Sequence, residues 1–454
     1  MTQFNSRRTS LRAGALAILA LASCRSGYEP KPLAEAEMLA RLDAPVEPSR
    51  AAPVAGERLA ITLEQAQANA IARHPALRRL RSERGLVDAA DVRADSSPDP
   101  ELSASLLWIT PQAVLGGIAS LRWELLPPGT TDARRGLAGA LGESFDARLA
   151  GEEWRVAAEA RVAWLELAAR ELEVEIAEER AAATAATREF AARMLERGAA
   201  TNVEASVVDL EAAEAERDRT AASGALSTAR ARLARAAAIP PAYEVRTSAE
   251  GDPLAPVAPR VPEGEADPLL LRRLPEVQDA RSRYLVAERE LELACLGSLP
   301  RFSVGPDAER DADSTKFGGG GSVVLPITDA NQAAIAEATA RRDMAAREVE
   351  VGLFEARGRL LQAREEEAAA SRALAVHEGR VAPASEAALL AAERASDAGA
   401  ADLMAVLVAR QRALEAKQAG IALRAAHAVA VARVEAAFGP EPAPPAVAER
   451  GGAR

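Results

Sequence analysis

The sequence predicts a mainly α-helical fold with a small β part, and three observations support this prediction. Hydrophobic residues make up 48% of the 454 residues, whereas aromatic residues make up only 3%. This composition favours long helices that pack at close range over a compact globular core. Apolar residues recur at heptad spacing along extended segments. The chain also repeats its own residue pattern at an offset of about 200 positions.

The charge and the content of cysteine and histidine argue against several functions. The chain has 67 acidic and 56 basic residues, and its net charge of −11 argues against a nucleic-acid partner. Two cysteines and three widely separated histidines supply neither a disulfide framework nor a metal site built on His or Cys. No set of Ser, His and Asp, and no pair of carboxylates, has a spacing that indicates catalysis. We therefore expect no enzymatic activity, no cofactor and no metal site.

Residues 1–23 have the pattern of a secretory signal peptide. Three arginines precede an apolar run over 13–22, which is shorter than the roughly 20 residues that a spanning helix needs. The run leads into Leu21-Ala22-Ser23-Cys24, which resembles the bacterial lipobox and predicts lipid attachment at Cys24. The alternative is a plain signal peptide with a coincidental cysteine. Arg25 follows instead of an aspartate, which favours sorting to the outer membrane, where the lipid would anchor the chain.

Matching motifs in the same order indicate a tandem duplication of the mature chain. Two pairs match at an offset of 200, and two at an offset of 201. The pairs are Arg73-His74-Pro75 with Arg273-Leu274-Pro275, Pro100-Glu101-Leu102-Ser103 with Pro300-Arg301-Phe302-Ser303, Gly198 with Gly399, and Arg232-Leu233 with Arg433-Val434. The predicted segments are a signal peptide (1–23), an N-terminal linker (24–58), a first repeat (59–240), an inter-repeat linker (241–267), a second repeat (268–439) and a disordered tail (440–454).

Each repeat is expected to contain the same series of elements. A short helix comes first and begins with a capping box in which Thr62 and Gln65 are three residues apart. Two strand-like segments, a very long helix, a turn centred on glycine and a returning helix follow. The predicted helices cover about 61–96, 132–195 and 201–238 in the first repeat, and about 268–297, 329–395 and 400–438 in the second.

Heptad spacing within both long helices predicts seams along which helices pair side by side. Pro383, after Gly379, is expected to interrupt the second long helix. The first seam consists of Val162, Leu165, Ala169, Leu172 and Ile176, and the second of Val351, Phe354, Gly358 and Leu361.

Alternating residues predict four strands per chain, within about 98–126 and 299–327. Leu121, Trp123 and Leu125 share one face, and Val323 and Leu325 alternate in the same way. We expect these side chains to face the membrane. Four strands cannot close a barrel alone, but three chains would supply twelve. The alternative is a pair of β-hairpins in a soluble domain.

The glycines at 318–321 lack the Lys-Ser/Thr of a phosphate loop and fit a strand. The charged stretch 307–316 is interpreted as an extracellular loop.

Several of these motifs together resemble the TolC-like outer membrane efflux protein family, over about 60–439. The Asn331-Gln332 form of the second strand-to-helix junction is similar to the heavy-metal branch typified by CzcC and CusC. The motifs that carry the resemblance are Ile61-Thr62-Leu63-Glu64-Gln65-Ala66, His74-Pro75-Ala76-Leu77, Arg273-Leu274-Pro275-Glu276-Val277, Leu325-Pro326-Ile327 and Gly399-Ala400-Ala401-Asp402-Leu403.

The resemblance implies a homotrimer whose long hairpins form an α-helical barrel in the periplasm and whose strands form a twelve-stranded barrel in the outer membrane. Such a channel subunit would dock on a periplasmic adaptor protein and an inner-membrane pump, and it would release metal cations or small toxic compounds. Most of the chain would lie in the periplasm. A lipid-anchored periplasmic coiled-coil scaffold is the alternative from another class.

The resemblance also places the turns between long helices at periplasmic tips, where the adaptor would dock. Small residues there would let a partner helix approach closely. These docking residues are Gly198, Ala199, Ala200, Gly399, Ala400 and Ala401. Many family members carry acidic residues beyond the second tip, but this chain has Ala405 and Val408 there. Asp402 and Glu204 are therefore the candidates for a charged pore mouth, and a helix cap is the alternative role of Asp402.

Overall fold

The computed structural model describes residues 33–45, 56–109, 114–198, 201–260, 274–310, 314–398 and 403–439. The chain divides into two units, 1–52 and 53–454. The described part of the first unit is one exposed helix, α2 (Glu35–Leu42), within the segment predicted as an N-terminal linker. The predicted signal peptide, Cys24 and the tail 440–454 lie outside the described residues.

The first helical segment of the second unit consists of three short helices where a single one was predicted. They are α3 (Leu63–Arg73), α4 (Pro75–Ser82) and α5 (Arg84–Asp95). The predicted capping box is confirmed: Gln65 N–H donates to Thr62 Oγ1 at 3.2 Å, and Thr62 N–H donates to Gln65 Oε1 at 3.0 Å. Helix α4 starts anew because Pro75 occupies its first turn, where its missing N–H needs no partner.

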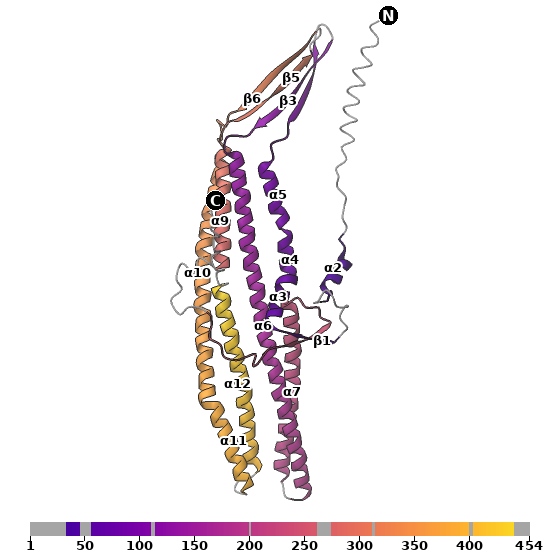
Figure 1. Cartoon of the computed structure of the whole chain (residues 1–454), viewed down its shortest axis with the longest axis vertical. Coiled ribbons are helices and arrows are strands. Elements are labelled where there is room, and N and C mark those ends of the chain that lie inside the picture. Colours follow the sequence, from indigo (N-terminus) through magenta and orange to yellow (C-terminus); the bar gives the residue numbers. More distant parts are fainter. Residues whose placement is uncertain are drawn as a thin grey trace, which may run out of the picture. The chain divides into compact units, whose positions relative to one another are not determined.

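The predicted long hairpins are present in both repeats (Figure 1). In the first, α6 (Thr130–Glu196) is followed by the returning helix α7 (Asn202–Ala236). In the second, α9 (Pro275–Leu296) precedes α10 (Gln332–Val376), α11 (Ala382–Asp397) and the returning helix α12 (Leu403–Phe438). A π-helix, η1 (His377–Val381), separates α10 from α11, so the interruption expected near Pro383 is confirmed.

Equivalent positions of the two repeats are buried alike, which supports the duplication. At an offset of 200, Leu77 and Val277 are both fully buried. The side chains of Ala160 and Leu360, at the same offset, are at most 2% exposed. On the returning helices the offset is 201, where Leu233 and Val434 are both buried. The repeats therefore share one packing pattern as well as one order of elements.

The two predicted heptad seams differ in the structure. In the first seam Leu165, Ala169 and Ile176 are buried, as expected. The second seam is largely exposed: Phe354 is 79% exposed and Val351 53%. This seam does not pack within the chain, because α10 turns another face inward. That buried face includes Ala356 and Leu360, which pack against Leu274 and Val277 at the start of α9.

The four predicted strands form one antiparallel sheet in the order β2-β3-β5-β6. They are β2 (Glu101–Ile109), β3 (Val114–Leu125), β5 (Arg301–Arg310) and β6 (Thr315–Val324). Within the second unit, this sheet lies at one end of the long helices, and the C-terminal ends of α6 and α11 lie at the other (Figure 1). The interpretation of 307–316 as a loop is wrong, because most of it continues the pairing of β5 with β6.

A second, two-stranded sheet was not predicted. Strand β1 (Glu57–Ile61) pairs in parallel with β4 (Tyr243–Thr247). Both strands lie at or within segments predicted as linkers. The sheet is fixed to the first long helix because Trp164 donates its indole N–H to the carbonyl oxygen of Ile61 at 2.9 Å.

Candidate functional site

The four-stranded sheet has one apolar face. Residues directly opposite one another in an antiparallel sheet share a face, and the register aligns Leu125, Phe302 and Val323 across β3, β5 and β6. The next row along the same face places Trp123 beside Val304. Large apolar side chains on this face are exposed, including Leu102, Leu106, Trp123, Leu125, Phe302, Val304, Phe317 and Val323.

The opposite face of the same sheet is mostly polar, although it also carries Ile118 and Val324. Ser103 and Ser120 approach each other at 2.7 Å across β2 and β3. Ser303 and Ser322 repeat this contact at 2.8 Å across β5 and β6. Two ion pairs lie on the same face, Arg122 with Asp307 at 2.6 Å and Arg301 with Glu124 at 3.7 Å. The polar residues therefore interact with one another along the whole width of the sheet.

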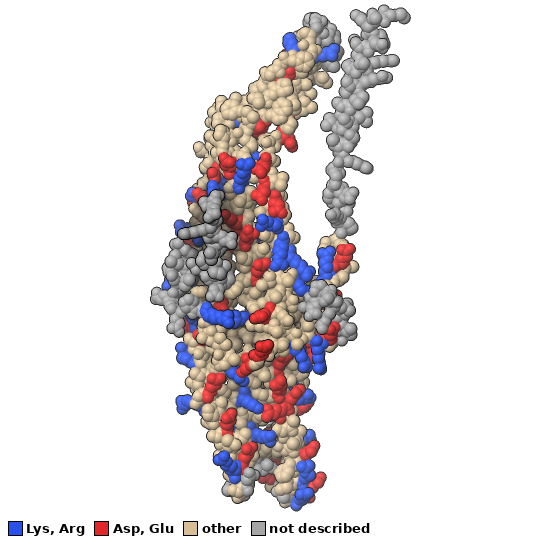
Figure 2. Space-filling view, in the orientation of Figure 1, with Lys and Arg blue, Asp and Glu red and all other residues tan. Residues whose placement is uncertain are grey.

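This two-faced alternation is typical of strands that separate hydrocarbon from water. An exposed apolar surface of this extent on a soluble monomer is unusual and indicates contact with a membrane or another protein. In the view of Figure 2, charged side chains are spread along the helices, whereas the sheet is mostly uncharged. Among the helices that the structure describes, none combines the length and the apolar character needed to cross a membrane.

Four of the five residues predicted to face the membrane lie on the apolar face. Leu121, Trp123 and Leu125 alternate along β3, and Val323 continues their face in β6. Leu325 does not belong to the strand, because β6 ends at Val324. Its placement on a membrane-facing strand is therefore wrong, although the side chain is exposed. The chain after Val324 leads into Pro326 and the turn before α10.

The predicted tips are described only in part. Gly198 ends the first long helix with a φ of +67°, a conformation that glycine adopts without steric cost. Ala199, Ala200, Gly399, Ala400, Ala401 and Asp402 lie outside the described residues. The carboxylate of Glu204 accepts hydrogen bonds from Thr201 N–H at 2.7 Å and from Thr201 Oγ1 at 2.9 Å. Glu204 thus completes a capping box at the start of α7.

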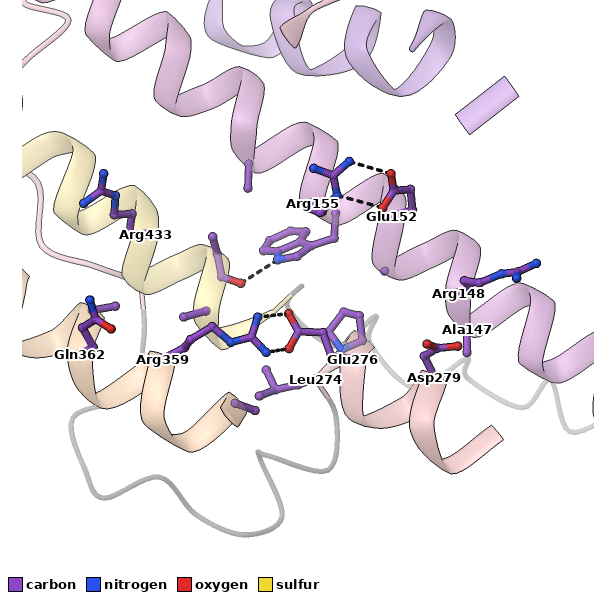
Figure 3. A pocket seen from close by; sticks show the side chains of 18 of the residues that line it. Ala147, Arg148, Glu152, Arg155, Leu274, Glu276, Asp279, Arg359, Gln362 and Arg433 are labelled. Carbon is purple, nitrogen blue, oxygen red and sulfur yellow. Dashed lines mark hydrogen bonds and ion pairs between the residues drawn. The ribbon is translucent and has the colours of Figure 1, made fainter. Parts of the chain in front are cut away.

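A cleft of about 560 Å³ lies where the two repeats meet, between α6, α9, α10 and α12 (Figure 3). Every charged side chain that lines it has an oppositely charged partner. The partners are Glu276 with Arg359, Glu152 with Arg155, Glu366 with Arg433, Arg148 with Glu83, and Asp279 with Arg283. The cleft therefore offers no uncompensated charge to a ligand, and the pairs Glu276–Arg359 and Glu366–Arg433 join helices.

Hydrogen bonds from Arg155 are the main reason that the pKa of Glu152 lies below its ordinary value. The two side chains meet at 2.7 and 2.9 Å. Close by, Trp154 donates its indole N–H to the carbonyl oxygen of Ala436 at 2.9 Å. Within the described ranges, no group of three or more His, Cys, Asp or Glu residues is placed to hold a metal ion.

Comparisons with known proteins agree with this architecture. No protein-family model matches the sequence, and no curated protein matches it either. Solved structures do. The outer-membrane channel OprN is similar with a TM-score of 0.69 and 20% identity, over 83% of this chain and 89% of that chain. VceC, an outer membrane protein of Vibrio cholerae, is similar with a TM-score of 0.64 and 18% identity, over 83% and 96%.

CusC, described in connection with transmembrane channel formation, is similar with a TM-score of 0.67 and 15% identity, over 92% of this chain and 99% of that chain. By TM-score this likeness is no closer than the one to OprN, so the heavy-metal branch stays a prediction. These likenesses confirm the predicted fold of the single chain, which is mainly α-helical with a small β part. The chain has the fold of the outer-membrane channels, with two tandem helical hairpins and a four-stranded sheet.

Proposed function

We propose that this chain is a subunit of an outer-membrane channel that serves as the passive exit duct of a tripartite efflux system. The four-stranded sheet is the observation that carries the proposal. Its apolar face would meet hydrocarbon, and its polar face would line a water-filled interior. A coiled-coil scaffold, the alternative function, would leave an exposed apolar face with residues such as Phe317, 83% exposed, facing water.

The duplication supports assembly with further copies of the chain. In the first repeat, one face of α6 is covered by the second repeat. Gly151 lies against Pro275 of α9, where an added Cβ would come within 3.3 Å of the proline Cβ. Farther along the same face, Trp154 bonds the carbonyl of Ala436 and Arg161 pairs with Glu435, both on α12.

The equivalent face of α10, 200 positions later, is the exposed second seam. Val351, Phe354 and Leu361 correspond to Gly151, Trp154 and Arg161. Within one chain, the second repeat covers this face of α6. We infer that the equivalent face of α10 is covered by the first repeat of the next copy. Such head-to-tail contacts generate a closed ring when the rotation closes. Three copies would bring twelve strands together, which is within the range of membrane barrels.

The two ends of the long helices are assigned different partners in this proposal. The sheet would lie in the outer membrane, and Cys24 would add a lipid anchor. The long helices would extend into the periplasm, where the turns at Gly198 and Gly399 would meet a periplasmic adaptor protein and an inner-membrane pump. The neighbours in fold are channels, which supports a duct without catalytic activity. Substrates would pass through the duct after delivery by the pump.

Purified protein in planar lipid bilayers tests the proposal. We expect stepwise ion conductance, migration as a heat-sensitive trimer, and extraction from the outer membrane only with detergent. Mass spectrometry of the mature N-terminus should find an acylated cysteine at Cys24. Absence of conductance together with release of the protein by salt or carbonate washing would refute the channel and favour the scaffold.

A further inference from the structure

Arg122 does not project away from the polar face of the sheet but lies along it. Its backbone belongs to β3, and its Nη1 donates to the carbonyl oxygen of Gly305 in β5 at 3.2 Å. The same nitrogen lies 2.6 Å from Oδ1 of Asp307, also in β5. This contact is an ion pair that lacks the geometry of a hydrogen bond, and Oδ1 accepts no hydrogen bond. The two side chains are only 24% and 28% exposed.

Gly320 leaves the space that this orientation needs, and Gly305 lets β5 approach β3 closely beneath it. A Cβ on Gly320 in β6 would lie 2.6 Å from Nη2 of Arg122 and would overlap the carboxylate of Asp307. A Cβ on Gly305 would overlap the backbone carbonyl of Leu121. Both positions alternate onto the polar face. The guanidinium therefore reaches across β5 to the surface of β6, over strand positions that carry no side chain.

We propose that the pair of Arg122 and Asp307 keeps the duct free of net fixed charge at its own level of the barrel. This inference rests on the proposed function, in which the polar face lines the lumen. Each copy would then contribute one pair at the same level of the barrel, and each pair is electrically neutral. The potential of an unpaired charge reaches about 8 Å into physiological salt solution. Removing one member of the pair would therefore leave a ring of like charges within reach of passing ions.

The pair also keeps this level of the lumen wide. While Asp307 holds the guanidinium against Gly305 and Gly320, the arginine does not extend into the lumen. Without the carboxylate, or with a side chain at position 320, the arginine would have to leave the surface of the sheet. Charge and width are thus controlled by the same pair of residues.

Bilayer recordings on the full-length protein test the proposal, with reversal potentials measured in a salt gradient of potassium chloride. Asp307→Asn should shift the permeability ratio several-fold toward anions, and Arg122→Gln should shift it toward cations. The double variant Arg122→Gln with Asp307→Asn is the matched control, because it removes both charges and leaves this level of the lumen neutral. Its shift should be clearly smaller. Gly320→Ala should lower the single-channel conductance, with an unchanged far-UV circular dichroism spectrum and unchanged trimer migration.

The outcomes separate this inference from the proposed function. A wild-type protein without conductance would overturn the channel itself. A conducting wild type whose reversal potential is unaltered by both Asp307→Asn and Arg122→Gln would overturn the role of the pair and leave the channel in place. Equal shifts in Asp307→Asn and in the double variant would also overturn it, because the unpaired arginine would then have no effect on passing ions.

Discussion

Glu366 on α10 pairs with Arg433 on α12 at 3.2 Å, and this contact repeats one from the first half of the chain. There, Glu166 on α6 pairs with Arg232 on α7 at 2.9 Å. The glutamates are 200 positions apart and the arginines 201. One extra residue must therefore lie between Glu366 and the second tip. The π-helix η1 lies in this interval, and its wider turn accommodates one residue without shifting the flanking helical faces.

Deleting Gly379 should therefore convert η1 into regular α-helix with little loss of stability. We expect a thermal midpoint close to that of the wild type and equal helical content by circular dichroism. Deletion of Glu178 on α6 is the matched control. It would rotate the following residues by one position and displace Arg180 from Asp218, a pair at 2.7 Å. That deletion should cost about 3 kcal/mol or more. Equal losses in both deletions would show that η1 does not hold an inserted residue.

The exposed second seam predicts a variant that folds but does not assemble. Phe354→Glu places a charge on a side chain that is 79% exposed in the single chain, so the fold should tolerate it. At a contact between copies the same charge would be buried without a partner, which is strongly destabilising. We expect loss of the trimer in cross-linking and in native electrophoresis. Val257→Glu, at another exposed apolar side chain, should assemble normally. Normal trimers of Phe354→Glu would contradict the head-to-tail arrangement.

The low pKa of Glu152 predicts how its contribution to stability depends on pH. The folded-state pKa is lowered mainly by hydrogen bonds from Arg155, so the stabilisation is present above the unfolded-state pKa of about 4.3. It is lost as the pH falls through the folded-state value. Because the pair is partly exposed, Glu152→Gln should lower the free energy of unfolding near neutral pH by only about 0.5 kcal/mol.

Unfolding of Glu152→Gln and wild type should therefore be compared at about pH 7 and about pH 3. The difference should shrink in acid, as the wild-type carboxyl takes up its proton. Arg155→Gln should reproduce the loss at neutral pH. A difference that persists in acid would assign the effect to packing in the cleft instead of to charge.

Periodicity determined how much of the fold could be predicted. The long helices and the apolar sheet face follow from repeats of 3.6 and 2 residues, which local sequence displays. The pairing of β1 with β4 does not, because Glu57 and Tyr243 are brought together only by the helices between them. The second seam shows another limit. Heptad spacing identifies the apolar stripe with Phe354 but cannot tell whether its partner belongs to the same chain.

The candidate site also contains residues that local sequence predicts and residues that only the sheet register reveals. Trp123 and Leu125 were predicted from alternation within one strand. The pair of Arg122 and Asp307 was missed because the stretch around Asp307 reads as a charged loop when its neighbours across the sheet are unknown. Gly305 and the glycines of β6 hide the alternation there, since glycine belongs to neither an apolar nor a polar pattern. Only the register, which aligns Asp307 with Ser120 and Gly318, places it on the polar face.

The two acidic candidates at the pore mouth should differ in their roles. The carboxylate of Glu204 accepts two hydrogen bonds from Thr201, and its N–H donates to Thr201 Oγ1 at 3.2 Å. Glu204→Gln keeps an acceptor, so stability and ion preference should both hold, whereas Glu204→Ala should cost about 1 kcal/mol as a lost cap. Asp402, three positions beyond Gly399, is the predicted pore-lining acid, and Asp402→Asn should lower the cation preference at unchanged thermal stability. A fall in cation preference in Glu204→Gln but not in Asp402→Asn would exchange the two roles and place the charged mouth on the first tip.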